Sequence, residues 1–239
     1  MGCKLVKAVI LAAGLGTRMR PYTLFIPKAM LPLGEKPVLE HQIDWLKSIG
    51  IKKIGICVGY LRKIIEDYFG DGSEQDVEIT YIKTRKPLGT AGQLKSASNF
   101  ADETFVCTYG DSIFDFDIAQ LVKAHLEKKS LATIALQQHQ ITSKYGFIDT
   151  DKGGNVKRWR EKPKFSGLIN IGCYVMEPRF LNYIPSNVMF GMDEAIRKSL
   201  LSKEPVQGVK VKGEFVDIGD RKSYIKAYDQ YLNRLGRIA

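Results

Sequence analysis

The sequence predicts a doubly wound α/β protein, in which helices cover both faces of one mixed, mostly parallel sheet. Apolar strand-like runs alternate with helix-like segments over about the first 130 residues, a rhythm typical of parallel sheets built by right-handed crossovers. Short strand-like segments and tight turns dominate the remainder. Because no linker rich in Ser, Gly or Pro and no internal repeat separates the two parts, we expect a single domain over residues 1–239.

The composition permits a large hydrophobic core and favours an anionic partner. Of 239 residues, 44% are hydrophobic and 26% are charged, which excludes a disordered or fibrous chain. Lys and Arg number 36 against 26 Asp and Glu, so the formal net charge is +10. Because the basic residues are scattered and form neither a long run nor an aromatic–basic stripe, they favour small phosphorylated molecules over nucleic acid.

Nothing in the sequence indicates a membrane or secreted protein. No segment reaches the ~18 consecutive apolar residues of a spanning helix, and no signal peptide is recognisable. The cysteines are far apart and form no CxxC pair, a pattern typical of reduced thiols. They are Cys3, Cys57, Cys107 and Cys173. We therefore expect a cytoplasmic protein without membrane contact.

The elements of the first part follow from periodicity and terminators. Residues 5–13 are almost continuously apolar, as in a strand buried on both faces. Residues 38–49 place apolar side chains at helical spacing before Gly50, which ends the predicted helix. The same criteria predict strands at residues 53–59, 77–82 and 104–109 and helices at residues 61–69, 91–100 and 118–126. These make four strand–helix units.

The second part is predicted as a mixed arrangement of short strands and two helices. Residues 152–155, Lys-Gly-Gly-Asn, form the clearest turn between strands. Strands are predicted at residues 131–138, 146–150, 156–160, 169–176, 206–211 and 214–218, and helices at residues 193–201 and 222–235.

The loop after the first predicted strand carries the strongest chemical signal. It lies at the carboxyl end of that strand, where open α/β sheets bind ligands, and Gly14 and Gly16 would let backbone N–H groups approach phosphates. Met19 replaces the third glycine of the dinucleotide fingerprint, and the Gly-Lys-Ser/Thr of P-loops is absent. Arg18 and Lys28 supply cations suited to phosphate oxygens. On the loop residues alone, ordinary turn glycines with a solvated arginine remain an alternative.

A series of segments, in order and including Tyr145-Gly146, resembles the sugar-1-phosphate nucleotidyltransferase (NDP-sugar pyrophosphorylase) family. The stretches LAAGLGTRMRP and PKAMLPLGEKP together resemble its amino-terminal signature. The other segments are LGTAG at residues 88–92, YGD at 109–111, EKP at 161–163, NIG at 170–172 and FVDIGD at 215–220. The resemblance covers about residues 7–228 and implies a Rossmann-like, GT-A-like fold of nucleotide-diphospho-sugar transferases. It further implies a nucleotide-binding half at about residues 1–130 and a sugar-phosphate-binding half at about 131–239.

The resemblance implies Mg²⁺-dependent transfer of a nucleotidyl group from an NTP to a sugar-1-phosphate, which releases pyrophosphate. Mannose- or glucose-1-phosphate with GTP, UTP or dTTP are the expected small-molecule substrates. Two polyanions repel each other, so such a site needs cations and a metal. Asp111 and Asp217 each end an apolar strand-like run and are the metal ligands that the resemblance implies.

The remaining implied roles fall into three groups. Catalytic cations are Arg18, Lys28 and Lys162. Nucleotide contacts come from Leu11, Ala13, Gly14, Gly16, Thr17, Gly89 and Thr90. Sugar-phosphate contacts come from Gly146, Glu161, Lys162 and Asn170.

Several alternatives remain open at this point. The chain could be a cytidylyl- or uridylyltransferase for another phosphorylated alcohol, or a non-catalytic regulatory subunit that binds an NDP-sugar. The presence of all the implied charged residues favours an enzyme. LGTAG resembles the guanylyl branch more than the thymidylyl branch, but residues 84–87 lack the acid or amide that helps many members read the base. No hexapeptide repeat precedes Ala239, so we expect no β-helix domain, and a homo-oligomer is possible.

Overall fold

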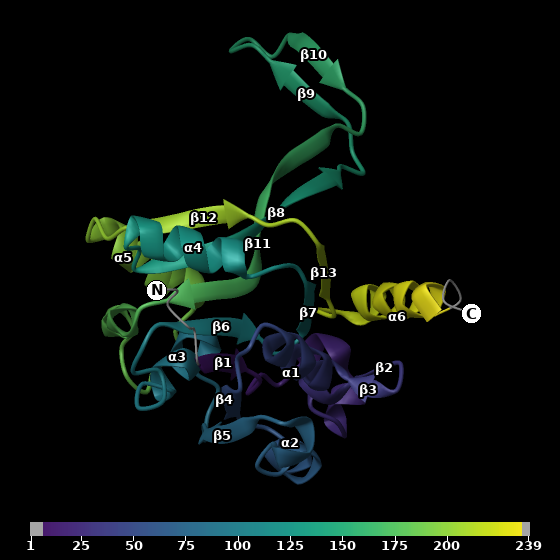
Figure 1. Cartoon of the computed structure of the whole chain (residues 1–239). Helices are drawn as coiled ribbons and strands as arrows, with labels where there is room; N and C mark the ends of the chain where they lie inside the picture. Colours follow the sequence, from purple (N-terminus) through teal and green to yellow (C-terminus); the bar gives the residue numbers. More distant parts are fainter. Residues whose placement is uncertain (1–6, 236–239) are drawn as a thin grey trace.

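A seven-stranded mixed sheet forms the centre of the computed structural model, which describes residues 7–235. The strand order is β12-β8-β11-β6-β1-β4-β5 (Figure 1). The strands are β1 (Lys7–Leu11), β4 (Lys53–Val58), β5 (Glu78–Lys83), β6 (Phe105–Tyr109), β8 (Ala132–Thr142), β11 (Lys164–Met176) and β12 (Val206–Lys210). All run parallel except β11, which is antiparallel to both of its neighbours. This arrangement confirms the predicted mixed, mostly parallel sheet.

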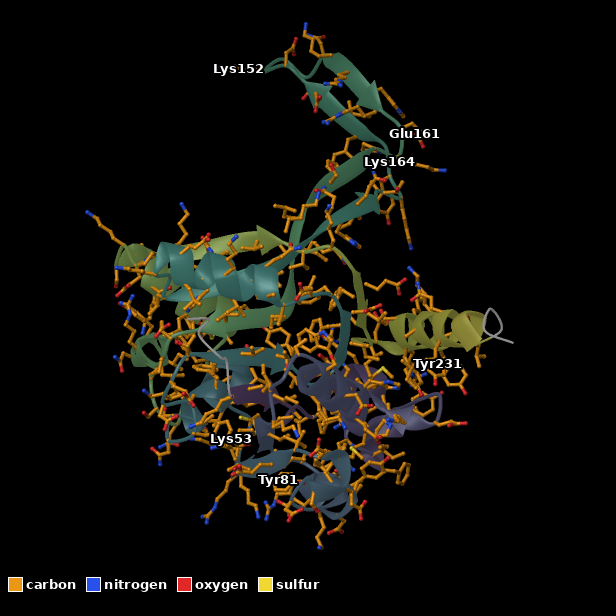
Figure 2. The ribbon with its side chains drawn as sticks, in the orientation of Figure 1. Lys53, Tyr81, Lys152, Glu161, Lys164 and Tyr231 are labelled. Atoms are coloured by element: carbon orange, nitrogen blue, oxygen red, sulfur yellow. The ribbon has the colours of Figure 1, made fainter. Side chains whose placement is uncertain are left out.

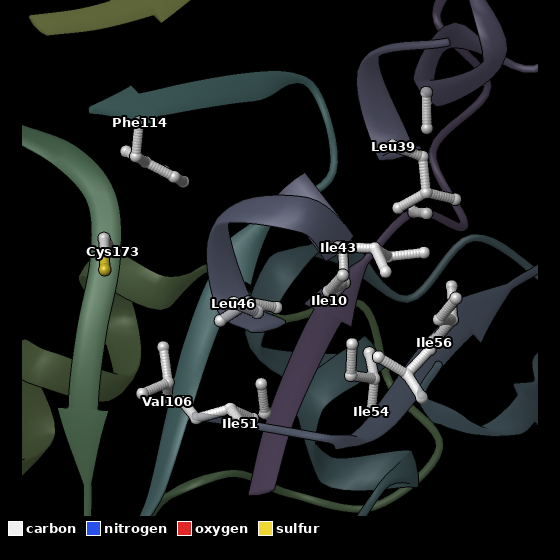
Figure 3. Close-up of a cluster of buried hydrophobic side chains, with 14 of the residues drawn as sticks. Ile10, Leu39, Ile43, Leu46, Ile51, Ile54, Ile56, Val106, Phe114 and Cys173 are labelled. Carbon is white, nitrogen blue, oxygen red and sulfur yellow. The ribbon is translucent and has the colours of Figure 1, made fainter. Parts of the chain in front are cut away.

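Helices cover both faces of the sheet, because successive residues of each strand point to opposite sides. Ala8 and Ile10 of β1 belong to a buried cluster with residues of α1, α2 and α4. Figure 3 shows Ile10 of this cluster with side chains of α1. Val9 and Leu11 pack on the opposite face with α3 and α5. The helices are α1 (Val38–Ser48), α2 (Arg62–Phe69), α3 (Gly89–Ser96), α4 (Ala119–Lys128), α5 (Met192–Leu201) and α6 (Arg221–Leu235). The fold is therefore doubly wound, as predicted.

Smaller elements differ from the prediction or fall outside it. The loop after β1 contains three short 3-10 turns and the hairpin β2 (Pro32–Leu33) and β3 (Lys36–Pro37). Strand β7 (Ser112–Asp115) was not predicted, and it pairs antiparallel with β13 (Glu214–Asp217). Residues 5 and 6 of the first predicted strand, and Cys3, lie outside the described residues. Cys57, Cys107 and Cys173 are buried free thiols.

Strands β8 and β11 continue beyond the sheet into a projecting arm, which we define as residues 138–168. They remain paired from Leu168, opposite Gln138, to Lys164, opposite Thr142. Between them, β9 (Phe147–Thr150) and β10 (Val156–Arg160) form the hairpin predicted around residues 152–155. Figure 1 shows the arm standing away from the rest of the molecule, which we call the body. The body thus contains the rest of the sheet and the six α-helices of the described residues.

Candidate functional site

A pocket of about 350 Å³ lies where β1 and β6 end, at Leu11 and Tyr109. Its lining contains these residues predicted from the sequence: Leu11, Gly14, Gly16, Thr17, Arg18, Lys28, Thr90 and Asp111. The structure therefore brings together most of the predicted nucleotide contacts, two of the predicted cations and one predicted metal ligand. This is the carboxyl edge of the parallel strands, where such sheets bind ligands.

Gly16 allows the glycine-rich loop to fold back on itself. Its φ is +60°, and a Cβ at this position would lie 2.8 Å from Cγ2 of Thr23, so a larger residue would be strained. The Thr23 hydroxyl donates to the Gly16 carbonyl at 2.8 Å. The same Cβ would lie 3.2 Å from Cβ of Lys28. The tight turn therefore places the Lys28 side chain directly beside the loop.

Asp111 and Asp217 converge although they are far apart in the sequence. Asp111 follows β6, and Asp217 ends β13, where it pairs opposite Ser112 of β7. The backbone N–H of Ile218 donates to the Asp111 carbonyl at 3.1 Å, which joins the two segments. The structure thus joins the two segments that carry Asp111 and Asp217, and their role as metal ligands stays a prediction.

The negative charge of Asp111 acts on the Asp217 carboxylate. Partial burial of its carboxylate, and then the negative charge of Asp111, raise the pKa of Asp217 above its usual range. The positive charge of the Lys28 ammonium lowers the pKa of Asp217. The same ammonium forms an ion pair with the Asp111 carboxylate. Two neighbouring carboxylates of this kind are costly unless a cation lies between them.

The pair has the chemistry of a site for a hard divalent cation. Within residues 7–235, no group of three or more His, Cys, Asp or Glu side chains could hold a metal ion. A cation at Asp111 and Asp217 would therefore complete its coordination with water and substrate oxygens. Small, hard divalent cations commonly bind to few carboxylates in this way, so the residues fit such an ion.

A second pocket of about 420 Å³ adjoins the first and shares Thr90 and Tyr109 with it. Asn170 lines this pocket together with residues of α5, including Arg197. The Asn170 amide donates to the Tyr174 hydroxyl at 2.6 Å, and that hydroxyl lies 2.8 Å from the Tyr109 hydroxyl. Asn170 is therefore connected to the wall that separates the two pockets.

The other predicted sugar-phosphate residues lie on the arm. Gly146, Glu161 and Lys162 are exposed and line neither pocket. Figure 2 shows Glu161 on the arm, away from the body. The Trp159 indole N–H donates to Glu161 at 3.2 Å. The structure thus places Asn170 beside the pockets and does not bring these three residues to it.

The last two predicted nucleotide contacts have different surroundings. Ala13 lines a third pocket of about 480 Å³, with residues 84–87 forming part of its wall. Gly89 has a φ of +69°, and a Cβ there would lie 2.6 Å from the Phe190 carbonyl oxygen. The structure therefore gives Gly89 a packing reason to be glycine.

Two buried glutamines contact the site loops and were missed by the sequence analysis. The Gln93 side chain on α3 accepts a hydrogen bond from the Ala13 N–H at 3.0 Å. Gln42 on α1 bonds to backbone carbonyls on either side of Asp111. The available signal for Gln42 was its place beside Ile43 and between Leu39 and Leu46, on the apolar face of the predicted helix.

Comparisons with known proteins find related sequences over nearly the whole chain. The family model described as "Nucleotidyl transferase" matches residues 7–234. The UTP–glucose-1-phosphate uridylyltransferase of Synechocystis is 38% identical over 248 residues, which span 96% of this chain and 64% of that protein. The mannose-1-phosphate guanyltransferase of Yarrowia lipolytica is 31% identical, over 97% of this chain and 66% of that protein. The chain thus spans slightly less than two thirds of the length of these two relatives.

A solved structure supports the same likeness. A crystal structure of a candidate glucose-1-phosphate thymidylyltransferase from Bacillus anthracis, in complex with sucrose, superposes with a TM-score of 0.78. The two chains are 26% identical, and the match covers 95% of each. Separately, none of the helices in the described part of the chain has the length and apolar character needed to cross a membrane.

Proposed function

Because the chain belongs to the nucleotidyl transferase family, we propose that it transfers a nucleotidyl group from an NTP to a sugar-1-phosphate and releases pyrophosphate. The observation that carries this proposal is the first pocket. It combines a glycine-rich loop, the cations Arg18 and Lys28, and the Asp111 carboxylate, whose negative charge acts on the neighbouring Asp217. This set of groups suits phosphorylated small molecules as binding partners.

The reaction joins two polyanions, so the main task of the site is to neutralise and position charge. An oxygen of the sugar-1-phosphate attacks the α-phosphorus of the NTP, and the bond from that phosphorus to the β-phosphate bridging oxygen breaks. The attacking oxygen is already anionic, so the reaction needs no general base. Arg18 and Lys28 stabilise the charge that moves toward the leaving pyrophosphate.

Asp111 and Asp217 are the residues that would hold Mg²⁺. Bound there, Mg²⁺ would supply positive charge to the phosphate oxygens. The Lys28 ammonium, which is paired with Asp111, keeps the two carboxylates partly neutralised before substrate binds. The carboxylates and the cations therefore act as one set of balanced charges.

We place the sugar-1-phosphate beside Asn170, in the second pocket, which adjoins the first through Thr90 and Tyr109. Lys162 can neutralise the sugar phosphate only in an arrangement that brings the arm over this pocket, either within one chain or from a second copy. Glucose- or mannose-1-phosphate with UTP, GTP or dTTP are the proposed substrates, because the relatives are named for such reactions. A cytoplasmic location stays a prediction.

A pyrophosphate-release assay tests the proposal. ATP, GTP, UTP, CTP and dTTP are each combined with glucose-, mannose-, galactose- and N-acetylglucosamine-1-phosphate, with Mg²⁺ and with EDTA. We expect release with at least one pair, dependent on the divalent cation. Binding of an NDP-sugar without any turnover would identify a regulatory subunit instead. Release only with CTP or UTP and a different phosphorylated alcohol would favour the cytidylyl- or uridylyltransferase alternative.

A further inference from the structure

Gln42 is a fully buried amide side chain to which the proposed reaction assigns no role. It lies on α1 with an exposed fraction of 0%. Its Nε2 donates to the Tyr109 carbonyl at 2.6 Å and also to the Ser112 carbonyl. Its Oε1 accepts a hydrogen bond from the Thr108 hydroxyl at 3.1 Å. Every hydrogen-bonding group of this amide therefore has a partner in the segment from residue 108 to 112.

These contacts bracket Asp111. Tyr109 and Ser112 lie on either side of it, at the end of β6 and the start of β7. The same segment is held by two backbone bonds, from Gly110 N–H to the Leu11 carbonyl at 3.0 Å and from Ile218 N–H to the Asp111 carbonyl at 3.1 Å. The corner that carries Asp111 is thus fixed from β1, from the end of β13 and, through Gln42, from α1.

The Ser112 contact extends this effect to the second carboxylate. Ser112 pairs opposite Asp217, so an anchor on Ser112 also fixes the strand pair on which Asp217 stands. Mg²⁺ requires near-ideal octahedral geometry and tolerates little displacement of its ligands. We propose that Gln42 is a positioning residue that sets the Asp111 carboxylate, relative to Asp217, for binding of a divalent cation. The inference rests on the metal role in the proposed function.

The three contacts explain why the residue is glutamine. Two buried carbonyl oxygens need two N–H donors, and the Thr108 hydroxyl needs an acceptor. Glutamate would place a carboxylate against two carbonyl oxygens. Methionine has a similar length but leaves both carbonyls and the hydroxyl unpaired, which favours movement of the corner. Gln42→Met is therefore the variant that removes the anchor and keeps the volume.

Trp45→Phe provides a matched control on the same helix. The Trp45 indole N–H donates to the Phe116 carbonyl at 3.2 Å, on the far side of β7 from Asp111. This variant removes a hydrogen bond from α1 to the same stretch of chain but leaves the contacts around Asp111 intact. A general loss of stability would affect both variants, whereas a positioning role would affect only Gln42→Met.

The test is direct titration of the intact chain with Mn²⁺, in which free Mn²⁺ is followed by electron paramagnetic resonance. We expect the Kd for Mn²⁺ to rise at least fivefold in Gln42→Met and to change less than twofold in Trp45→Phe. The Kd for UTP, GTP or dTTP measured in EDTA should change less than twofold in both variants. Asp111→Asn serves as the reference that removes a ligand.

Each outcome decides the inference. An unchanged Mn²⁺ Kd in Gln42→Met, with weaker binding in Asp111→Asn, would overturn the positioning role and leave the proposed function intact. An unchanged Kd in Asp111→Asn would remove the metal site and the inference with it. If Gln42→Met does not fold, Thr108→Val replaces it, because it removes the hydroxyl that orients the amide. That variant should raise the Mn²⁺ Kd two- to threefold, and an unchanged Kd would contradict the proposal.

Discussion

The body and the arm hold their charged residues in different ways. In the body, Lys28 contacts Asp111, and the backbone around both is fixed by buried hydrogen bonds. On the arm, large apolar side chains are exposed, with 64% of Trp159 and 77% of Tyr145 accessible to solvent. Side-chain contacts within the arm, such as the ring pair Phe147 and Phe165, hold its own strands together. These contacts do not connect the arm to the body.

The geometry of the site is therefore set in advance in the body and not on the arm. The carboxylates Asp111 and Asp217 and the cations of the first pocket are positioned by the fold itself, as electrostatic catalysis requires. Lys162 and Glu161 have no such support, since a ribbon exposed on both sides is only marginally held by itself. We therefore expect changes in the body to reduce turnover and changes on the arm to act mainly on sugar-phosphate binding.

The largest effect is expected at the paired carboxylates. Asp111→Asn and Asp217→Asn should each lower kcat by about a thousandfold, because each removes a charge that would hold the metal at the reacting phosphates. Pyrophosphate release measures this, with circular dichroism to show that the fold is kept. Asp115→Asn is the control, since Asp115 is exposed on β7 beside the same site. Equal losses in all three variants would contradict a specific metal role.

The next largest loss of kcat is expected in the glycine-rich loop, at Arg18. Arg18 lines the first pocket, and its guanidinium can hold two phosphate oxygens at once. Arg18→Ala should lower kcat by about a hundredfold, as loss of a transition-state contact does. Arg18→Lys should lose much of the same rate, because an ammonium lacks the bidentate fork. Affinity for the NDP-sugar should stay within tenfold, and Arg20→Ala, which changes a residue outside the pocket, is the control.

An intermediate effect compares the two regions directly. Lys28→Ala should weaken NTP binding more than sugar-phosphate binding, and Lys162→Ala should do the reverse. Each loss should be about ten- to a hundredfold, the usual cost of a charge-assisted hydrogen bond. Separate KM values for the two substrates measure the split, with Lys164→Ala as a control on the same arm. Equal effects on both substrates would show that body and arm do not divide the substrates between them.

The sequence predicted best those elements whose signals are local. The helix at residues 38–49 and the strand at 53–59 follow from spacing and glycine terminators, and α1 and β4 lie where they were predicted. In each case a few adjacent residues carry the information.

The features that could not be predicted depend on partners distant in the sequence. Gln42 bonds to residues 66 to 70 positions away, and Gln93 reaches back 80 positions to Ala13, so neither contact leaves a local pattern. The hairpin at residues 147–160 was predicted, but β8 continues to Thr142 because β11 pairs with it. A strand runs beyond its sheet only where a partner strand pairs with it. Lys162 lies on the arm that this pairing forms, so its position could not be predicted from local sequence.

The two ends of β8 allow the comparison to be tested within one strand. At the body end, His125 of α4 is buried and lies 2.9 Å from the Thr133 hydroxyl through Nδ1 and 3.1 Å from Glu177 through Nε2. A neutral ring satisfies both contacts when Nε2 carries the proton and the Thr133 hydroxyl donates to Nδ1. At the arm end, His139 is exposed to solvent.

The smallest expected effect is a difference in acid stability between these two histidines. Burial lowers the pKa of His125 below its usual value of 6.5, and the Glu177 carboxylate offsets this only in part. As the pH falls below 6.5, the unfolded chain therefore binds a proton before the folded one does, and stability is lost. His125→Gln should reduce the fall in Tm between pH 7 and pH 5 by a few degrees, whereas His139→Gln should leave it unchanged, as thermal unfolding can measure. A steeper fall in His125→Gln would mean that the imidazolium is stabilised by Glu177, and an equal response of both variants would show that the body and arm ends of β8 are not held differently.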